Sequence, residues 1–420
     1  MDTRTPTDNP TPEKAPLVPI LRRGLPTAPS VILHILIALS AAMLPACAVG
    51  LIADPGESNT LLFGVEIAAA LISFLQLAYL WRACRRARGL VPVIVVFGIF
   101  SYLATASFIP LSMGLSLLFA LGMGSMLLAV SSKKALVWFP LVPLGAFAVS
   151  LAVTGDLLIS LACLVPFPAA IALAQGTRAA AARKDGPNRV GVICLTSLAL
   201  GASLAALAAA LVYRALGTLD VTAILEWLDG GRTWLTDALV SLELTVPSAS
   251  GEEIPVDAAY AANLVNQAVN LIPALVVVSV NILSTLAQMI QHAALAAFGF
   301  GESVSDRVRV FAMSAVSGVV FIAAYLTALL SGTETSTLAG TVAENVALIL
   351  QPGLALCGLL RLVATFVSRR RRLGCGFFLL ILIPVVLFSA PVVFAFYEGF
   401  SLTVGRLLAR VKPPVDPDSQ

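Results

Sequence analysis

Long apolar runs alternate with short charged stretches along most of this chain. A transmembrane helix needs about 20 mostly apolar residues. By that length the pattern predicts about eleven spans, joined for the most part by short connections. We place them at residues 29–52, 61–81, 90–109, 111–130, 135–154, 156–175, 190–212, 264–287, 310–331, 342–366 and 375–397. The expected fold class is therefore all-α, a polytopic transmembrane helix bundle.

Arginine and lysine gather in every second loop of this predicted arrangement. They precede the first span and follow the second, fourth, sixth, eighth and tenth, whereas the intervening loops carry Asp54, Glu57, Asp156 and Glu334. Because cytoplasmic loops are enriched in basic residues, we expect a cytoplasmic N-terminus. An odd number of spans puts the C-terminus outside, yet the tail carries Arg406, Arg410 and Lys412. Either one span is miscounted, the tail violates the rule, or it lies along the membrane surface.

The longest stretch without a predicted span, residues 213–262, is rich in aspartate and glutamate. Leucines recur in it at near-helical spacing, and Gly230-Gly231 interrupts them, so we expect two short amphipathic helices on the outer face. This segment divides the chain. We expect a disordered cytoplasmic tail at 1–28, an N-terminal transmembrane bundle at 29–212, an extracytoplasmic amphipathic segment at 213–262, a C-terminal transmembrane bundle at 263–400 and a basic, Pro-rich tail at 401–420.

Composition supports the membrane interpretation. The chain is 59% hydrophobic and 12% charged, against about 45–50% and about 25% in soluble domains. Its net charge of +3 comes from arginine-rich loops, which are topology signals and not a nucleic-acid footprint. We expect a multi-pass protein of the cell membrane that is surrounded by the lipid bilayer and binds no nucleic acid.

Amide side chains follow one face of the eighth predicted span. The polar residues there are Asn263, Asn266, Gln267, Asn270, Asn281, Ser284, Gln288, Gln291 and His292. Such a face is excluded from lipid tails. It either forms hydrogen bonds between helices, as amides commonly do in membranes, or lines a substrate cavity. Pro273 lies within the same span and is expected to kink it.

Two acidic residues lie within or at the start of predicted spans. Glu66 is isolated in the second span, and Glu344 opens the tenth. A carboxylate in such a place is protonated, paired with a cation or close to water. A proton or cation relay would explain both, and proximity to the outer interface explains Glu344 equally well. The candidate polar cavity therefore comprises Asn270, Asn281, Gln288, Glu344 and Glu66.

The chain carries no motif for an enzymatic reaction. None of its six cysteines forms a C-x-x-C pair, and it has two histidines, His34 and His292. Nucleophile elbow, P-loop, dinucleotide fingerprint and metalloprotease helix are all missing. We expect no catalytic residues, no cofactor and no metal. Energy for any transport would come from a gradient or from a partner, such as other membrane subunits or an ATPase.

Three stretches of the second half resemble the YybS-like family of predicted membrane proteins, whose function is unknown. They are Leu271–Leu275 (LIPAL), Gln351–Ala355 (QPGLA) with the arginine run 369–372, and Tyr397–Phe400 (YEGF) with Arg406 and Arg410. The order of bundle, outer segment and bundle fits as well. The family's N-terminal half is similar to the substrate-binding subunits of energy-coupling-factor vitamin transporters. The resemblance implies ligand capture and supplies no catalytic residues.

The leading expectation is thus a substrate-binding or transport-associated component. The alternative is a structural or assembly protein that serves envelope or spore formation.

Overall fold

A computed structural model describes residues 27–52, 60–83, 107–130, 139–181, 189–242, 245–247, 253–300, 313–331, 338–369 and 391–411. Helices make up nearly all of these residues, so the chain is an all-α helix bundle. Its residues form two compact units. Unit 1 comprises residues 1–203 and 284–306, and unit 2 comprises residues 204–283 and 307–420.

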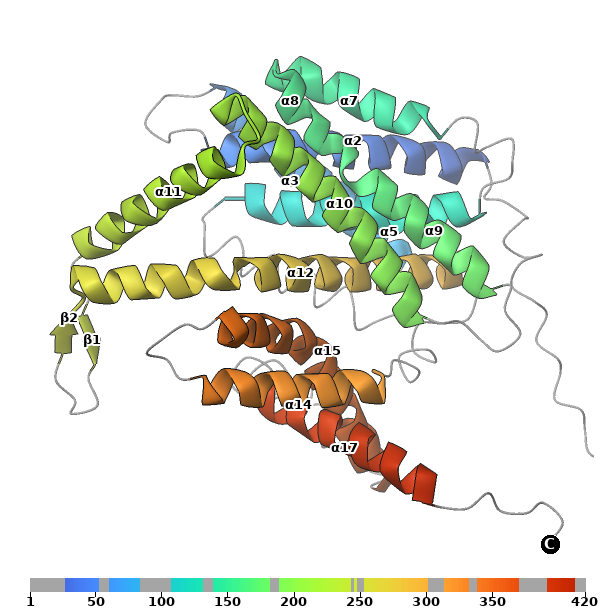
Figure 1. Cartoon of the computed structure of the whole chain (residues 1–420). Helices are drawn as coiled ribbons and strands as arrows, with labels where there is room; N and C mark the ends of the chain where they lie inside the picture. Colours follow the sequence, from blue (N-terminus) through green and yellow to red (C-terminus); the bar gives the residue numbers. More distant parts are fainter. Residues whose placement is uncertain are drawn as a thin grey trace, which may run out of the picture. The chain divides into compact units, whose positions relative to one another are not determined.

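Unit 1 is built around one buried helix. Its helices are α2 (Thr27–Ile52), α3 (Thr60–Ala83), α5 (Ile109–Val130), α7 (Leu141–Thr154), α8 (Leu157–Ser160), the 3-10 turn η1 (Leu161–Leu164), α9 (Pro166–Ala181) and the first part of α10 (Arg189–Leu216) (Figure 1). α5 packs against α2, α3 and α9 and is buried along nearly its whole length. A helix that is apolar on all sides is suited to such a central place, as it is to contact with lipid.

The predicted span 156–175 is interrupted in the structure. Asp156 caps α8 by accepting hydrogen bonds from the backbone N–H groups of Leu158 and Ile159. The chain then tightens into η1, and α9 begins at Pro166. Proline disfavours the interior of a helix because it lacks the N–H donor, but it suits the first position of a new one. The prediction of one uninterrupted helix did not include this break, although residues 157–179 together remain long and apolar enough to cross a membrane.

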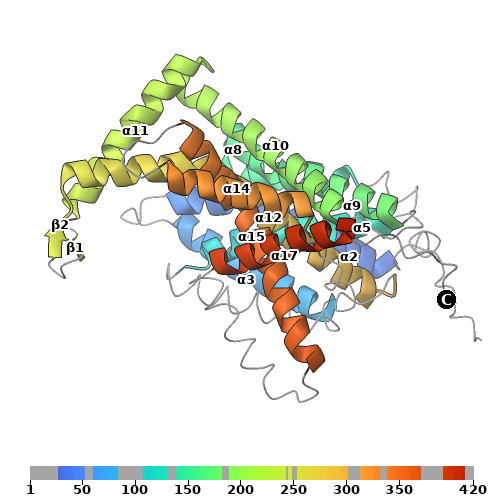
Figure 2. The ribbon, with the colours of Figure 1, turned by 60° about the horizontal axis from the view of Figure 1, so that its bottom comes forward.

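Unit 2 contains a tight group of three helices, α14 (Ala315–Leu330), α15 (Leu338–Arg369) and α17 (Pro391–Val411), which pack against one another (Figures 1 and 2). Their core includes Phe321, whose ring centroid lies 5.2 Å from that of Phe396. α14 and α17 approach closely at Gly318 and Gly399. A Cβ added to Gly318 would lie 2.9 Å from the Gly399 carbonyl oxygen, so this contact requires glycine.

Unit 2 also contains the segment predicted to lie outside the membrane. The prediction of two short helices there was wrong, because a single helix, α11 (Val221–Ser241), runs through Gly230 and Gly231. Glycine inside a helix costs about 1 kcal/mol relative to alanine, which weakens a helix without ending it. A small antiparallel hairpin of β1 (Thr245–Pro247) and β2 (Glu253–Pro255) follows, which the leucine pattern did not predict.

The longest helix, α12 (Ala258–Ala297), contributes to both units. Its last part, from Ser284, belongs to unit 1, where a Cβ added to Gly122 of α5 would lie 2.9 Å from Ile290. This division differs from the prediction, which assigned residues 258–262 of this helix to the extracytoplasmic segment and the rest to a C-terminal bundle. The predicted boundary at residue 400 also falls inside a helix, because α17 continues to Val411.

Seven helical segments among the described residues are long and apolar enough to cross a membrane, and three further apolar helices are shorter. These lengths and compositions are those of an integral membrane protein. Most of the predicted span 90–109 and the first part of 375–397 lie outside the described residues. The count of eleven spans and the cytoplasmic N-terminus stay predictions.

Candidate functional site

A buried polar layer joins α2, α3 and α5 inside unit 1. The side-chain nitrogen of Gln76 on α3 donates hydrogen bonds to the hydroxyl oxygens of Ser40 on α2, at 2.8 Å, and Ser116 on α5, at 3.0 Å. All three residues are 0% exposed. The Ser40 hydroxyl donates its own proton to the Leu36 carbonyl, at 2.6 Å. Ser40 therefore has to accept from Gln76, which fixes which end of the amide carries the nitrogen.

This orientation leaves the amide oxygen of Gln76 as the free end of the side chain. Among the described residues that buried oxygen has no hydrogen-bond partner, and neither does the hydroxyl of Ser73, one turn away on the same helix. On α5, one turn from Ser116, Ser112 is also fully buried and lies beside the thiol of Cys47, a weak hydrogen-bonding group. Polar atoms with unused hydrogen-bonding capacity thus gather along one three-helix interface.

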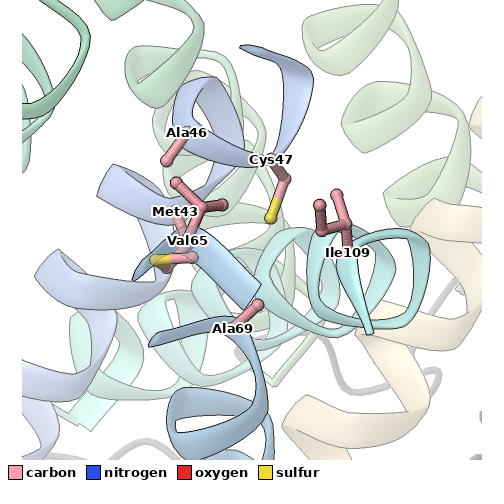
Figure 3. Close-up of a cluster of buried hydrophobic side chains, with 6 residues drawn as sticks. All are labelled: Met43, Ala46, Cys47, Val65, Ala69 and Ile109. Carbon is pink, nitrogen blue, oxygen red and sulfur yellow. The ribbon is translucent and has the colours of Figure 1, made fainter. Parts of the chain in front are cut away.

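An apolar cluster closes one end of this interface. Met43, Ala46, Cys47, Val65, Ala69 and Ile109 pack together between α2, α3 and α5 (Figure 3). Ser73 lies between Ala69 and Gln76 along α3, and Ser112 lies between Ile109 and Ser116 along α5. Both serines therefore occupy the level between the apolar cluster and the Gln76 layer. We call Ser40, Ser73, Gln76, Ser112 and Ser116 the serine–glutamine cluster.

A second polar contact in unit 1 joins α9 to α12. The Thr177 hydroxyl donates to the side-chain oxygen of Gln291, at 2.8 Å, and the Gln291 side-chain nitrogen has no partner among the described residues. The next residue on α9, Arg178, donates to the carbonyl oxygens of Leu128 and Ala129 near the end of α5. A cation there also interacts favourably with the helix dipole of α5.

In unit 2 an asparagine side chain forms hydrogen bonds with the backbone of another helix, next to a proline. Pro273 lies inside α12, and the Asn345 side chain of α15 contacts the turn around it. The Asn345 side-chain oxygen accepts from the Ala274 N–H, at 3.1 Å, and its nitrogen donates to the Asn270 carbonyl, at 2.9 Å. An uninterrupted helix would bond that N–H to that carbonyl directly. Asn345 therefore supplies a hydrogen-bond partner to each of these two backbone groups, at the point where the proline disturbs the hydrogen bonding of the helix.

The five residues of the predicted polar cavity differ in their surroundings. Gln288 is buried, Asn270, Asn281 and Glu66 are partly buried, and Glu344 is exposed. The side chain of Asn345, which neighbours Glu344 on α15, donates a hydrogen bond to the backbone carbonyl of Asn270. A groove of about 560 Å³ lies between α14 and α15, is apolar apart from Thr327, and is lined by none of the five. The polar cavity stays a prediction.

The sequence could have indicated Gln76, which the candidate set left out. A lone amide within the apolar run 71–80 follows the same rule that singled out Glu66. Its partners lie 36 and 40 residues away, however, and no local pattern connects them.

Within the described parts of the chain, no group of three or more His, Cys, Asp or Glu side chains is placed to hold a metal ion. The resemblance to the YybS-like family stays a prediction. The chain matches no protein-family model, no curated protein and no solved structure.

Proposed function

We propose that this chain is a transport-associated membrane protein that binds a small polar solute at the serine–glutamine cluster of unit 1. The observation that carries the proposal is that the Gln76 amide oxygen and the Ser73 hydroxyl, both buried, have no hydrogen-bond partner within the described part of the chain. A buried polar group without a partner costs about 1–3 kcal/mol, and lipid offers no water to relieve it. A solute or water that enters this interface would remove that cost.

The chemistry of the cluster restricts the solute. Gln76 offers an amide oxygen that accepts hydrogen bonds, and Ser73 and Ser112 offer hydroxyls that donate or accept. The cluster contains no charged side chain, so it has nothing to neutralise an anion or to hold a multivalent cation. It suits a small uncharged molecule with at least one hydrogen-bond donor. Because the sequence has no P-loop, energy for uptake would come from a gradient or a partner ATPase.

The alternative is a structural or assembly protein, and two contacts favour it. The amide of Gln291 binds Thr177, and that of Asn345 binds the backbone of α12. Both amides serve helix packing, which is the ordinary use of such residues in membranes. The serine–glutamine cluster differs because two buried polar groups without a partner among the described residues, the Gln76 amide oxygen and the Ser73 hydroxyl, lie one turn apart on the same helix.

The test compares the unfolding temperature of the purified protein with and without candidate solutes. The panel contains free amino acids, nucleosides, sugars, polyols and water-soluble vitamins. A ligand that binds the folded protein raises its unfolding temperature. We expect at least one compound to stabilise the wild type and to lose that effect in Gln76→Leu.

The matched control is Thr177→Val, which removes a buried interhelical hydrogen bond away from the cluster. This variant should be less stable and should still respond to the solute. A panel without any stabilising compound, or a response that persists in Gln76→Leu, would favour the structural alternative.

A further inference from the structure

Helix α11 presents two opposite faces and buries neither of them. Among its 21 residues none is buried. At 100° per residue, one side of the helix carries Val221, Ile224, Leu225, Trp227, Leu228, Trp234, Leu235 and Leu239, with Arg232 as the charged residue among them. The opposite side carries Glu226, Asp229, Thr233 and Asp237. Both tryptophans of the helix are exposed, Trp227 by 52% and Trp234 by 69%.

The connections of α11 hold it near the ends of two candidate spans. It follows α10 after the short turn 217–220, where Gly217 adopts a positive φ of 70°. Four extended residues reach at most about 14 Å, so the start of α11 stays close to the end of α10. Its other end leads through the β1–β2 hairpin into α12 (Figure 1). Both α10 and α12 are long and apolar enough to cross a membrane, whereas α11 is not among the candidate spans.

An amphipathic helix in that place has the membrane surface available to cover its apolar face. A helix with one apolar and one strongly polar face lies in the interface plane, and tryptophan favours the level of the headgroups. We propose that α11 lies in the membrane–water interface, with the side of Trp227 and Trp234 turned into the lipid. The occupant of this face is the lipid bilayer, and the inference is independent of any bound solute.

The charges on α11 define how it would associate with lipid. Its polar face carries three carboxylates, and Arg232 forms an ion pair with Asp229 at 3.8 Å. This pairing draws the guanidinium toward the polar face and away from the lipid. An acidic helix gains nothing from anionic headgroups. Burial of apolar area therefore drives the association, which should persist at high salt and in purely zwitterionic bilayers.

The experiment measures the depth of each tryptophan in the full-length protein. The chain has four tryptophans, and replacing the other three with phenylalanine leaves Trp234 as the only tryptophan, which is excited selectively at wavelengths that tyrosine does not absorb. This variant is reconstituted into zwitterionic vesicles with lipids brominated either near the headgroup or at mid-chain. We expect strong quenching by the shallow bromines and weaker quenching by the deep ones. A second variant that retains Trp227 alone should behave in the same way.

The matched control moves the fluorophore to the polar face. Thr233→Trp, with the native tryptophans replaced, should be quenched by aqueous iodide and little by brominated lipid. Equal lipid quenching of Trp234 and the Thr233→Trp variant would overturn the proposal. Quenching of Trp234 that disappears as the protein-to-lipid ratio rises would also overturn it, because the face would then bind a second copy.

Discussion

The contact between Asn345 on α15 and the turn around Pro273 on α12 leads to a prediction that substitutions at these two positions are energetically coupled. Replacing Asn345 with leucine keeps the number and branching of the side-chain heavy atoms but removes both interhelical hydrogen bonds, to the Ala274 N–H and the Asn270 carbonyl. Such bonds in membrane proteins contribute about 0.6–1.7 kcal/mol each. Because the two backbone groups also lose their partners, we expect Asn345→Leu to lower the free energy of unfolding by about 2–3 kcal/mol.

The Pro273→Ala variant should remove most of that cost. Alanine restores the N–H donor and relieves the clash of the proline ring with the preceding turn. The Ala274 N–H and the Asn270 carbonyl can then bond to each other as in an ordinary helix. In the Pro273→Ala background we therefore expect Asn345→Leu to cost less than about 1 kcal/mol, which gives a coupling energy of about 1–2 kcal/mol.

The measurement is a double-mutant cycle on the purified protein, unfolded in mixed detergent micelles and followed by circular dichroism. Glu344→Leu is the matched control, because Glu344 neighbours Asn345 on α15 but is exposed. Its effect should add to that of Pro273→Ala without coupling. If Asn345→Leu lowers the free energy of unfolding equally in the wild-type and Pro273→Ala backgrounds, Asn345 does not compensate for the hydrogen bonding that the proline disturbs, and the reasoning is refuted.

Three further substitutions test the packing. Gly122→Ala should lower the free energy of unfolding by about 1–3 kcal/mol, because its Cβ would lie 2.9 Å from Ile290. The control is Gly114→Ala on the same helix, where the added Cβ meets open space. Equal unfolding temperatures for the two variants would contradict this prediction. Gly230→Ala should stabilise α11 by about 0.5–1 kcal/mol, seen as slower hydrogen exchange, and faster exchange would indicate a need for glycine. Arg178→Gln should lower the unfolding temperature through a loss of about 1–2 kcal/mol, and an unchanged temperature would show that its bonds to α5 contribute little.

The long helices were predictable because lipid imposes a simple requirement. A span needs one uninterrupted apolar run, so the predicted ranges 111–130 and 190–212 lie within α5 and α10 of the structure. Where local backbone chemistry decides the outcome, the prediction was poorer. Pro166 starts a new helix inside an apolar run, and Gly230-Gly231 fails to end α11.

The polar contacts were much less predictable, because they join residues from distant parts of the chain. Glu344 attracted attention as an acid at the start of a span, yet it is exposed, and its neighbour Asn345 makes the contact with α12. Successive residues on a helix point about 100° apart, so a difference of one position selects a different environment. Similarly, Gln76 becomes notable once Ser40 and Ser116 are placed beside it.

The central claim is that polar molecules enter the serine–glutamine cluster, and cysteine accessibility tests it most directly. In a variant without the six native cysteines, one cysteine is introduced by Ser73→Cys and, separately, by Ala69→Cys. Both positions are buried on α3, but Ala69 belongs to the apolar cluster. With a small polar thiol reagent in reconstituted membranes, we predict labelling of the Ser73→Cys variant and protection of the Ala69→Cys variant. Equal protection of both would contradict the account, because the cluster would then be closed to polar molecules.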